Sequence, residues 1–175
     1  YTIWAKDWPR IMKNVVEACM SADAKLIFLD NIYMYGPSPL SIPFDENHIQ
    51  RPTTKKGKVR KEIADILLKA IQMGKIKGLI GRSADFYGPS AIFSPIYVSI
   101  LERMLQGKAP MVIAKPDVRH TYAYTGDVAK ALVMLALNET TYGEVWHLPV
   151  GKPITVKEII EILNSELGTD FKATY

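Results

Sequence analysis

The sequence is poor in cysteine and contains no long apolar run. The one cysteine among its 175 residues, Cys19, cannot form an internal disulfide, so a secreted scaffold built on disulfides is excluded. No apolar stretch approaches the ~20 residues that a membrane-spanning helix needs. These two shortages favour a cytoplasmic protein that has no membrane partner.

Several catalytic signatures are also missing. The three histidines and the single cysteine stand far apart in the sequence, so we predict no metal site. There is neither a Gly-x-Ser-x-Gly elbow nor a Gly-x-x-x-x-Gly-Lys loop, which removes the main support for a serine hydrolase or a P-loop NTPase.

What remains is an ordinary globular composition, with 48% hydrophobic and 23% charged residues and a net charge of +4. Strand-length apolar clusters alternate with segments of helical period, which predicts an α/β fold with a mainly parallel sheet. The expected helices cover 7–22, with Asp7 as cap and Pro9 in the first turn, then 55–73, 95–106, 125–138 and 155–167, the last opened by a Thr155–Glu158 capping box. The expected strands cover 25–29, 78–81, 111–114 and 144–148.

Polar residues follow the first two expected strands. Both following segments contain Tyr-Gly-Pro-Ser, at residues 35–38 and 87–90, which suggests two similar turns on one rim of the sheet. Ligands of open α/β sheets collect beyond the carboxyl ends of the strands, so this rim is the first place to look for a site. The spacing leaves open whether both segments are merely turns.

The helix expected between these strands begins with a basic run, residues 55–61. Lys56 and Arg60 stand four residues apart and therefore share a helix face. Their repulsion requires an anion, supplied by Asp30, by Asp85 or by a bound phosphate, unless the run is simply a solvated first turn. Either carboxylate is expected more as a structural ion pair than as a catalytic acid or base.

Five segments resemble, in order, the extended short-chain dehydrogenase/reductase superfamily, in its NAD-dependent epimerase/dehydratase group. They are Lys25–Gly36, Pro52–Lys69, Arg82–Pro89, Arg119–Leu135 and Glu144–Leu163. The resemblance implies a Rossmann-like sheet flanked by helices, with residues 1–90 in the dinucleotide-binding half and 91–175 in a small substrate-side region. The family's Gly-x-x-Gly-x-x-Gly loop is absent, so we expect the C-terminal portion of a longer enzyme that uses NAD or NADP.

The resemblance also implies roles for particular residues. The family's Ser or Thr after the strand is Asn31 here, and its Tyr-x-x-x-Lys pair is Lys56 and Arg60. Asn31 would orient the substrate, Lys56 would move the proton, and Arg60 would hold the nicotinamide ribose. Further candidates are Asp30, Tyr35, Ser83 and Ala84 for the cofactor, and Tyr33, Asp85 and Tyr87 for the substrate.

The expected function is hydride transfer to or from a carbonyl or alcohol carbon of a small polar substrate, sugar-like molecules included. Asp85 replaces the family's asparagine, and its charge would repel the diphosphate of a nucleotide sugar. One alternative is a catalytically inactive dinucleotide-binding sensor or scaffold of the same fold. An RNA-binding relative is less favoured, because the basic run is short and has no interleaved aromatic residues. The family's pairing mode implies a homodimer formed through helices 9–22 and 56–73.

Overall fold

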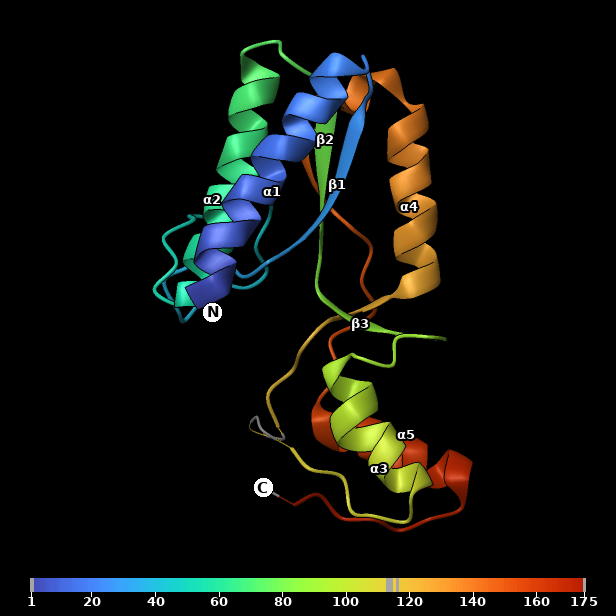
Figure 1. Ribbon diagram of the computed structural model, residues 1–175. Coiled ribbons are helices and arrows are strands. Elements are labelled where there is room, and N and C mark those ends of the chain that lie inside the picture. Colours follow the sequence, from blue (N-terminus) through green and yellow to red (C-terminus); the bar gives the residue numbers. More distant parts are fainter. Residues whose placement is uncertain (1, 113–114, 116, 175) are drawn as a thin grey trace. The chain divides into compact units, whose positions relative to one another are not determined.

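The computed structural model describes residues 2–112, 115 and 117–174. They form two compact units that interleave along the chain (Figure 1). The first unit comprises the residues up to Ser83 together with Lys130–Leu148, and the second comprises the remaining segments, Ala84–Ala129 and from Pro149 onward. The functional division at residue 90 stays a prediction.

The first unit contains a three-stranded parallel sheet. Its strands are β1 (Leu26–Asn31), β2 (Gly78–Ser83) and β5 (Val145–His147), in the order β1-β2-β5. This arrangement confirms the expected mainly parallel sheet. The register pairs Asp30 with Arg82 and Asn31 with Ser83, so the polar residues at the carboxyl ends of β1 and β2 lie side by side.

Helices cover both faces of this sheet (Figure 1). α1 (Thr2–Ser21) and α2 (Lys55–Gln72) lie together on one face, and their apolar sides form a core with the sheet. The part of α4 (Thr125–Leu137) that belongs to the first unit lies on the other face. Gly81 permits this approach, because a Cβ there would stand 2.7 Å from Leu132. In the described part of the chain, no helix is long and apolar enough to cross a membrane.

The expected start of the first helix is wrong. α1 begins at Thr2, and Pro9 is buried inside the helix instead of in its first turn. The additional residues include Trp4, whose ring and that of Trp8 lie near the guanidinium of Arg60. The helix therefore continues through Pro9, although proline usually marks the start of a helix, and this part of α1 packs against α2.

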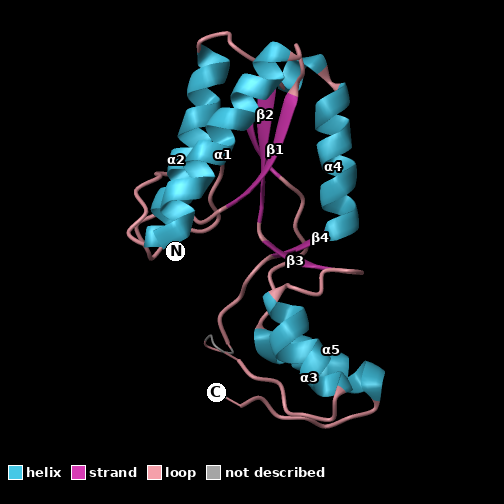
Figure 2. Ribbon diagram, viewed as in Figure 1, coloured by secondary structure: helices cyan, strands magenta, loops and turns pink. Residues whose placement is uncertain are grey.

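A two-stranded parallel sheet and a pair of packed helices make up the second unit (Figure 2). β3 (Asp85–Tyr87) pairs with β4 (Tyr122–Tyr124), two short strands that the sequence did not predict. The π-helix η1 (Tyr97–Leu101) continues into α3 (Glu102–Leu105), which packs with α5 (Val156–Leu167). The Thr155–Glu158 capping box is confirmed. Of the expected strand 111–114, residues 113 and 114 lie outside the described residues, and Met111 makes an isolated bridge to Thr174.

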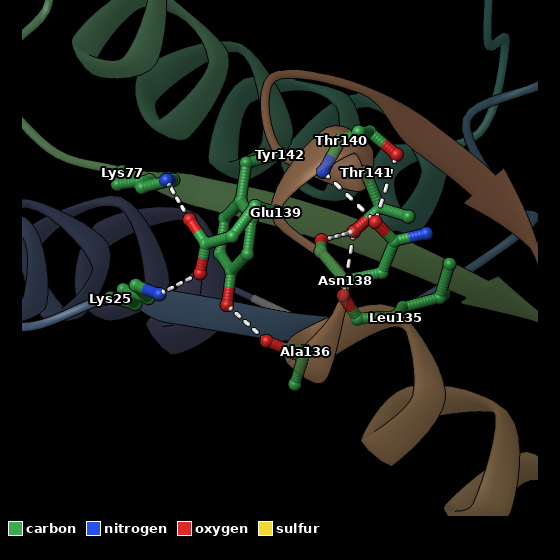
Figure 3. Close-up of polar contacts among 9 residues, drawn as sticks. All are labelled: Lys25, Lys77, Leu135, Ala136, Asn138, Glu139, Thr140, Thr141 and Tyr142. Atoms are coloured by element: carbon green, nitrogen blue, oxygen red, sulfur yellow. Dashed lines mark hydrogen bonds and ion pairs between the residues drawn. The ribbon is translucent and has the colours of Figure 1, made fainter.

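A small ionic cluster ties together the starts of β1 and β2 (Figure 3). Glu139, in the 3-10 helix η2 (Glu139–Thr141), forms ion pairs with both Lys25 and Lys77. Each ammonium also lies 5.1 Å from the centre of the Tyr142 ring. Three segments far apart in sequence thus meet at the amino-terminal edge of the sheet, away from the polar strand ends.

Candidate functional site

The loop after β1 begins with a side-chain turn at Asn31. Its Oδ1 accepts a hydrogen bond of 3.0 Å from the backbone N–H of Tyr33. Asparagine favours such turns because its short amide can bond to the backbone two residues later. With the oxygen used in this way, the group that Asn31 can offer to a ligand is its NH2 donor, which suits a carbonyl oxygen.

The first turn of α2 lies directly against this loop. Thr54 caps the helix by accepting a 3.0 Å hydrogen bond from the Gly57 N–H. A Cβ on Gly57 would stand only 2.4 Å from the Tyr33 carbonyl oxygen, so only glycine permits this approach. Lys56 is consequently placed with its Nζ 3.6 Å from the centre of the Tyr33 ring. The structure brings the predicted residues Asn31, Tyr33 and Lys56 together.

Aromatic rings contact both cations of α2, Lys56 and Arg60, for which the sequence analysis predicted a balancing anion. The Tyr33 ring face stabilises the Lys56 ammonium. One turn further along, the Arg60 guanidinium lies 5.5 Å and 5.1 Å from the rings of Trp4 and Trp8. The charge of Arg60 also acts on the carboxylate of Asp30, one of the anions that the sequence suggested.

The carboxylate of Asp30 and the guanidinium of Arg82 form a fully buried pair. Arg82 Nε lies 3.7 Å from Asp30 Oδ2, which is within ion-pair range but beyond a hydrogen bond. Burial raises the pKa of Asp30 from 3.8 to about 6, against the opposing influence of the Asn31 backbone, Arg82 and Arg60. Asp30 thus forms the structural ion pair that the sequence led us to expect. The fold compensates the charge of its carboxylate only in part.

Tyr35 belongs to a buried network behind the strand ends. Its hydroxyl accepts a 2.8 Å hydrogen bond from Arg82 Nη1 and lies 2.7 Å from His147 Nε2. The backbone N–H of His147 donates a separate hydrogen bond of 2.6 Å to the Glu46 carboxylate. Burial raises the pKa of Tyr35 and lowers the pKa of His147. Tyr35, expected to contact the cofactor, is 6% exposed, and its hydroxyl already has these partners.

Sequence reasoning missed the histidines around this tyrosine. The ring of His48 lies 6.0 Å from that of Tyr35, and His147 lies 5.4 Å away on β5. The two histidines are separated by almost a hundred residues, so no spacing signal could have found them. Ser83, also a cofactor candidate, is 2% exposed at the end of β2, and the neighbouring Ala84 is buried too.

Two of the expected substrate contacts belong to the second unit. Asp85 Oδ2 lies within hydrogen-bond distance, 3.2 Å, of His120 Nε2, a partner that the sequence did not reveal. The ring of Tyr87 packs in a tilted arrangement against that of Tyr124 on the neighbouring strand, with ring centres 5.6 Å apart. Burial and the nearby Asp85 raise the pKa of Tyr122. The site residues therefore divide between the units, with Tyr33, Asn31, Lys56 and Arg60 in the first, and Ala84, Asp85 and Tyr87 in the second.

The residues near Arg60 fit the ribose end of a dinucleotide. Within the described residues, both Asp30 carboxylate oxygens and Arg60 Nε are buried without a hydrogen-bond partner. A ribose diol offers both donors and acceptors, which are the groups these atoms need. The diphosphate end has no corresponding glycine-rich loop in the sequence.

Comparison with known proteins gives a consistent family match. Residues 6–148 match the sequence model of the NAD dependent epimerase/dehydratase family. A provisionally named UDP-glucose 4-epimerase of Methanocaldococcus jannaschii is 28% identical over 168 residues, which cover 93% of this chain and 53% of that protein.

Two solved structures share the fold. A UDP-glucuronic acid 4-epimerase variant from Bacillus cereus, in complex with NAD and a fluorinated UDP-glucuronic acid, superposes with a TM-score of 0.84 at 18% identity, over 94% of this chain and 52% of that one. The UDP-N-acetylglucosamine 4-epimerase from Methanobrevibacter ruminantium M1 gives 0.81 at 19% identity, over 93% and 54%. The chain thus spans about half the length of these relatives.

Proposed function

The chain belongs to the NAD-dependent epimerase/dehydratase family, and from that premise we propose that the protein is an NAD(P)-dependent oxidoreductase or epimerase. Its reaction moves a hydride to or from a carbonyl or alcohol carbon of a small polar substrate, sugar-like molecules included. The observation that supports this most directly is that Asn31 and Lys56 both contact Tyr33, Asn31 at its backbone N–H and Lys56 at its ring. By the resemblance, these two residues stand where the family carries its polar residue and its proton donor.

In this mechanism each residue has a defined part. The NH2 group of Asn31 donates a hydrogen bond to the substrate oxygen and orients it. In the reducing direction the Lys56 ammonium gives a proton to that oxygen as the carbonyl becomes an alcohol, and in the oxidising direction the amine takes the proton back. Arg60 and Asp30 hold the ribose hydroxyls. The nicotinamide, when bound, supplies or accepts the hydride.

Cofactor binding provides the first test. We expect the full-length protein to bind NADH or NADPH with a dissociation constant in the low micromolar range, about 1–10 µM, measured by the fluorescence of the reduced nicotinamide or by calorimetry. A complete lack of signal at ~1 mM cofactor would contradict the proposal.

Replacement of Lys56 provides the second test. Because general acid–base groups contribute about 10²–10⁴-fold to rate, Lys56→Met should lower turnover by at least 10²-fold and leave the cofactor dissociation constant nearly unchanged. The matched control is Lys58→Met, which alters an exposed lysine on the same turn of α2. Unchanged turnover in Lys56→Met would remove this lysine from the mechanism. Cofactor binding by the wild type without turnover of any carbonyl or alcohol in a broad panel would favour the sensor or scaffold.

We also propose that the protein forms a homodimer through α1 and α2. Ile11 and Val15 lie one turn apart on α1 and are 44% and 37% exposed, which leaves an apolar strip on the outer side of the helix. We expect Val15→Asp to convert a dimer into a monomer in light scattering. Val133→Asp, on an exposed position of α4, should leave the mass unchanged. A wild type that is monomeric at micromolar concentration would refute the dimer.

A further inference from the structure

A histidine and an aspartate form a dyad in the second unit. His120 Nε2 lies 3.2 Å from Asp85 Oδ2, within the range of a hydrogen bond and an ion pair. The two residues stand 35 positions apart in the sequence. The hydride transfer proposed above uses Asn31, Lys56 and Arg60 of the first unit, so it leaves this histidine without a part.

Paired backbone holds both members of the dyad. Asp85 is the first residue of β3 and stands opposite Tyr122 in the parallel β3–β4 register. His120 forms an isolated antiparallel bridge with Ile154, in which each backbone N–H donates to the other residue's carbonyl at 2.9 Å. The His120 ring also packs edge-on against the Tyr122 ring, with ring centres 4.8 Å apart. Side chains held in this way keep the orientation that acid–base chemistry requires.

A small molecule can reach the dyad. Side chains that are two apart on a strand, or opposite in register, share one face of a sheet, so Asp85, Tyr87 and Tyr122 lie on one face. Tyr87 and Tyr122 line a cavity of about 490 Å³ in the second unit, and the ring contact with Tyr122 places His120 beside it. The side chains of His120 and Asp85 are 42% and 30% exposed.

The carboxylate turns the histidine into an oriented acid–base group. An ionised carboxylate only accepts hydrogen bonds, so Nε2 of His120 is the donor in this contact. In the neutral ring, Nδ1 is then the nitrogen with a lone pair, and it can take a proton from a ligand. The imidazolium formed in this way is stabilised by the carboxylate of Asp85.

Two protons move in reactions at a carbonyl group. In the mechanism proposed above, Lys56 serves the proton on oxygen. The carbonyl also acidifies the C–H bond of the neighbouring carbon, and a positioned base is needed to break that bond at a useful rate. A second acid–base group suits this second proton.

We propose that His120, positioned by Asp85, exchanges the proton on the carbon next to the carbonyl group of a small hydroxycarbonyl compound. His120 Nδ1 takes the proton as the C–H bond breaks, and the electron pair of that bond enters the enolate. The imidazolium then returns a proton to the same carbon. The choice of a hydroxycarbonyl compound rests on the function proposed above, but the exchange is redox-neutral and needs no cofactor.

Deuterium exchange into dihydroxyacetone tests the proposal in the full-length protein without cofactor. In D2O the wild type should replace the CH2 hydrogens of dihydroxyacetone faster than buffer does, which is followed by the loss of their proton NMR signal. His120→Gln should lower the protein-catalysed rate by about 10²-fold or more, the usual contribution of a general base.

Variants of Asp85 test its positioning role. Asp85→Asn removes the charge that stabilises the imidazolium and should slow the exchange about 10- to 100-fold, the effect of one charge-assisted hydrogen bond. Asp85→Glu keeps a carboxylate and should retain more of the exchange than Asp85→Asn. The matched control is Asp170→Asn, which alters an exposed carboxylate of the same unit and should exchange like the wild type.

Chemical rescue separates a chemical role of His120 from a structural one. His120→Ala removes the ring beside Tyr122, and added imidazole should restore the exchange by about tenfold or more in a saturable manner. The same imidazole should do little for Asp85→Asn, in which the His120 ring is still present. Circular dichroism melting curves show that each variant is folded.

Three results would overturn the proposal. They are a wild type that exchanges dihydroxyacetone no faster than buffer, equal exchange by the wild type and His120→Gln, and a folded His120→Ala that imidazole does not rescue. Binding of NADH without exchange would remove the dyad from the chemistry and leave the proposed function intact. Exchange without any binding of NADH or NADPH would do the reverse.

Discussion

At the scale of single residues, Asp30 is a buried carboxylate that the first unit compensates only in part. Its carboxylate is completely buried, neither oxygen has a hydrogen bond within the described residues, and the nearest cation stands at 3.7 Å. Burying an incompletely paired charge costs free energy, which is why its pKa lies near 6. A ligand that donates hydrogen bonds to Asp30 would recover part of that cost.

This cost predicts a pH dependence of stability. The folded pKa of Asp30, about 6, lies above its usual value of 3.8, so its contribution is fully present below pH ~4 and is lost as the pH rises through about 6. The difference of about two pKa units corresponds to about 3 kcal/mol. Urea unfolding from pH 4 to 7 should show this decline in the wild type, and Asp30→Asn should lack it.

The matched control for this titration is Asp65→Asn, which alters an exposed carboxylate on α2. It should keep the decline between pH 4 and 6. Identical pH profiles for the wild type and Asp30→Asn would show that Asp30 titrates near its usual range in the folded protein.

At the scale of elements, the contact of α2 with the loop after β1 places Lys56. The Thr54 cap sets where the helix begins, and Gly57 lets the first turn approach the Tyr33 carbonyl. Alanine normally stabilises a helix by about 1 kcal/mol relative to glycine. The close approach to the Tyr33 carbonyl explains why glycine occupies position 57 instead.

Gly57→Ala should therefore destabilise the protein. The added Cβ would lie 2.4 Å from the Tyr33 oxygen and 2.7 Å from the Pro52 Cβ, and relief of that overlap should cost about 1–3 kcal/mol in unfolding free energy. Turnover should fall together with stability, because Lys56 moves with the helix turn. In Gly151→Ala the nearest atom would lie at 3.8 Å, so this variant should unfold like the wild type. A more stable Gly57→Ala protein would contradict the close approach.

At the scale of the whole molecule, the first unit is assembled from two separate stretches of chain. The Glu139 cluster joins the later stretch to the amino-terminal ends of β1 and β2. The two lysines lower the pKa of Glu139 to about 2 by hydrogen bonding and charge. Exposed ion pairs are screened by salt, so this cluster should contribute less at high ionic strength.

Glu139→Gln should lower the stability of the first unit near neutral pH. Because the folded pKa is depressed, the contribution is present above the usual value of 4.5 and is lost as the pH falls through about 2. The deficit of the variant in urea unfolding should therefore shrink at low pH and in high salt. Glu144→Gln, an exposed glutamate before β5, serves as control and should change little. If the loss of unfolding free energy in Glu139→Gln changed with neither pH nor salt, an electrostatic origin would be excluded.

Features that depend on neighbouring residues could be predicted from the sequence. Helical period and capping indicated α2 and α5, apolar clusters indicated β1, β2 and β5, and the alternation indicated the parallel sheet. The resemblance of five ordered segments indicated the family, and residues 6–148 match its sequence model. These signals lie in neighbouring residues or in the order of segments, so they can be recognised without knowledge of the packing.

Only the tertiary structure decided which side chains meet. The rings of Tyr33, Trp4 and Trp8 contact the cations of α2, and they come from segments before that helix. Tyr35 and His147 meet across 112 positions, and the cavity of the second unit draws its lining from five separate stretches of chain. Such contacts depend on how segments that are far apart in the sequence pack together. Neither the hydrophobic period of a segment nor the spacing of its residues specifies that packing.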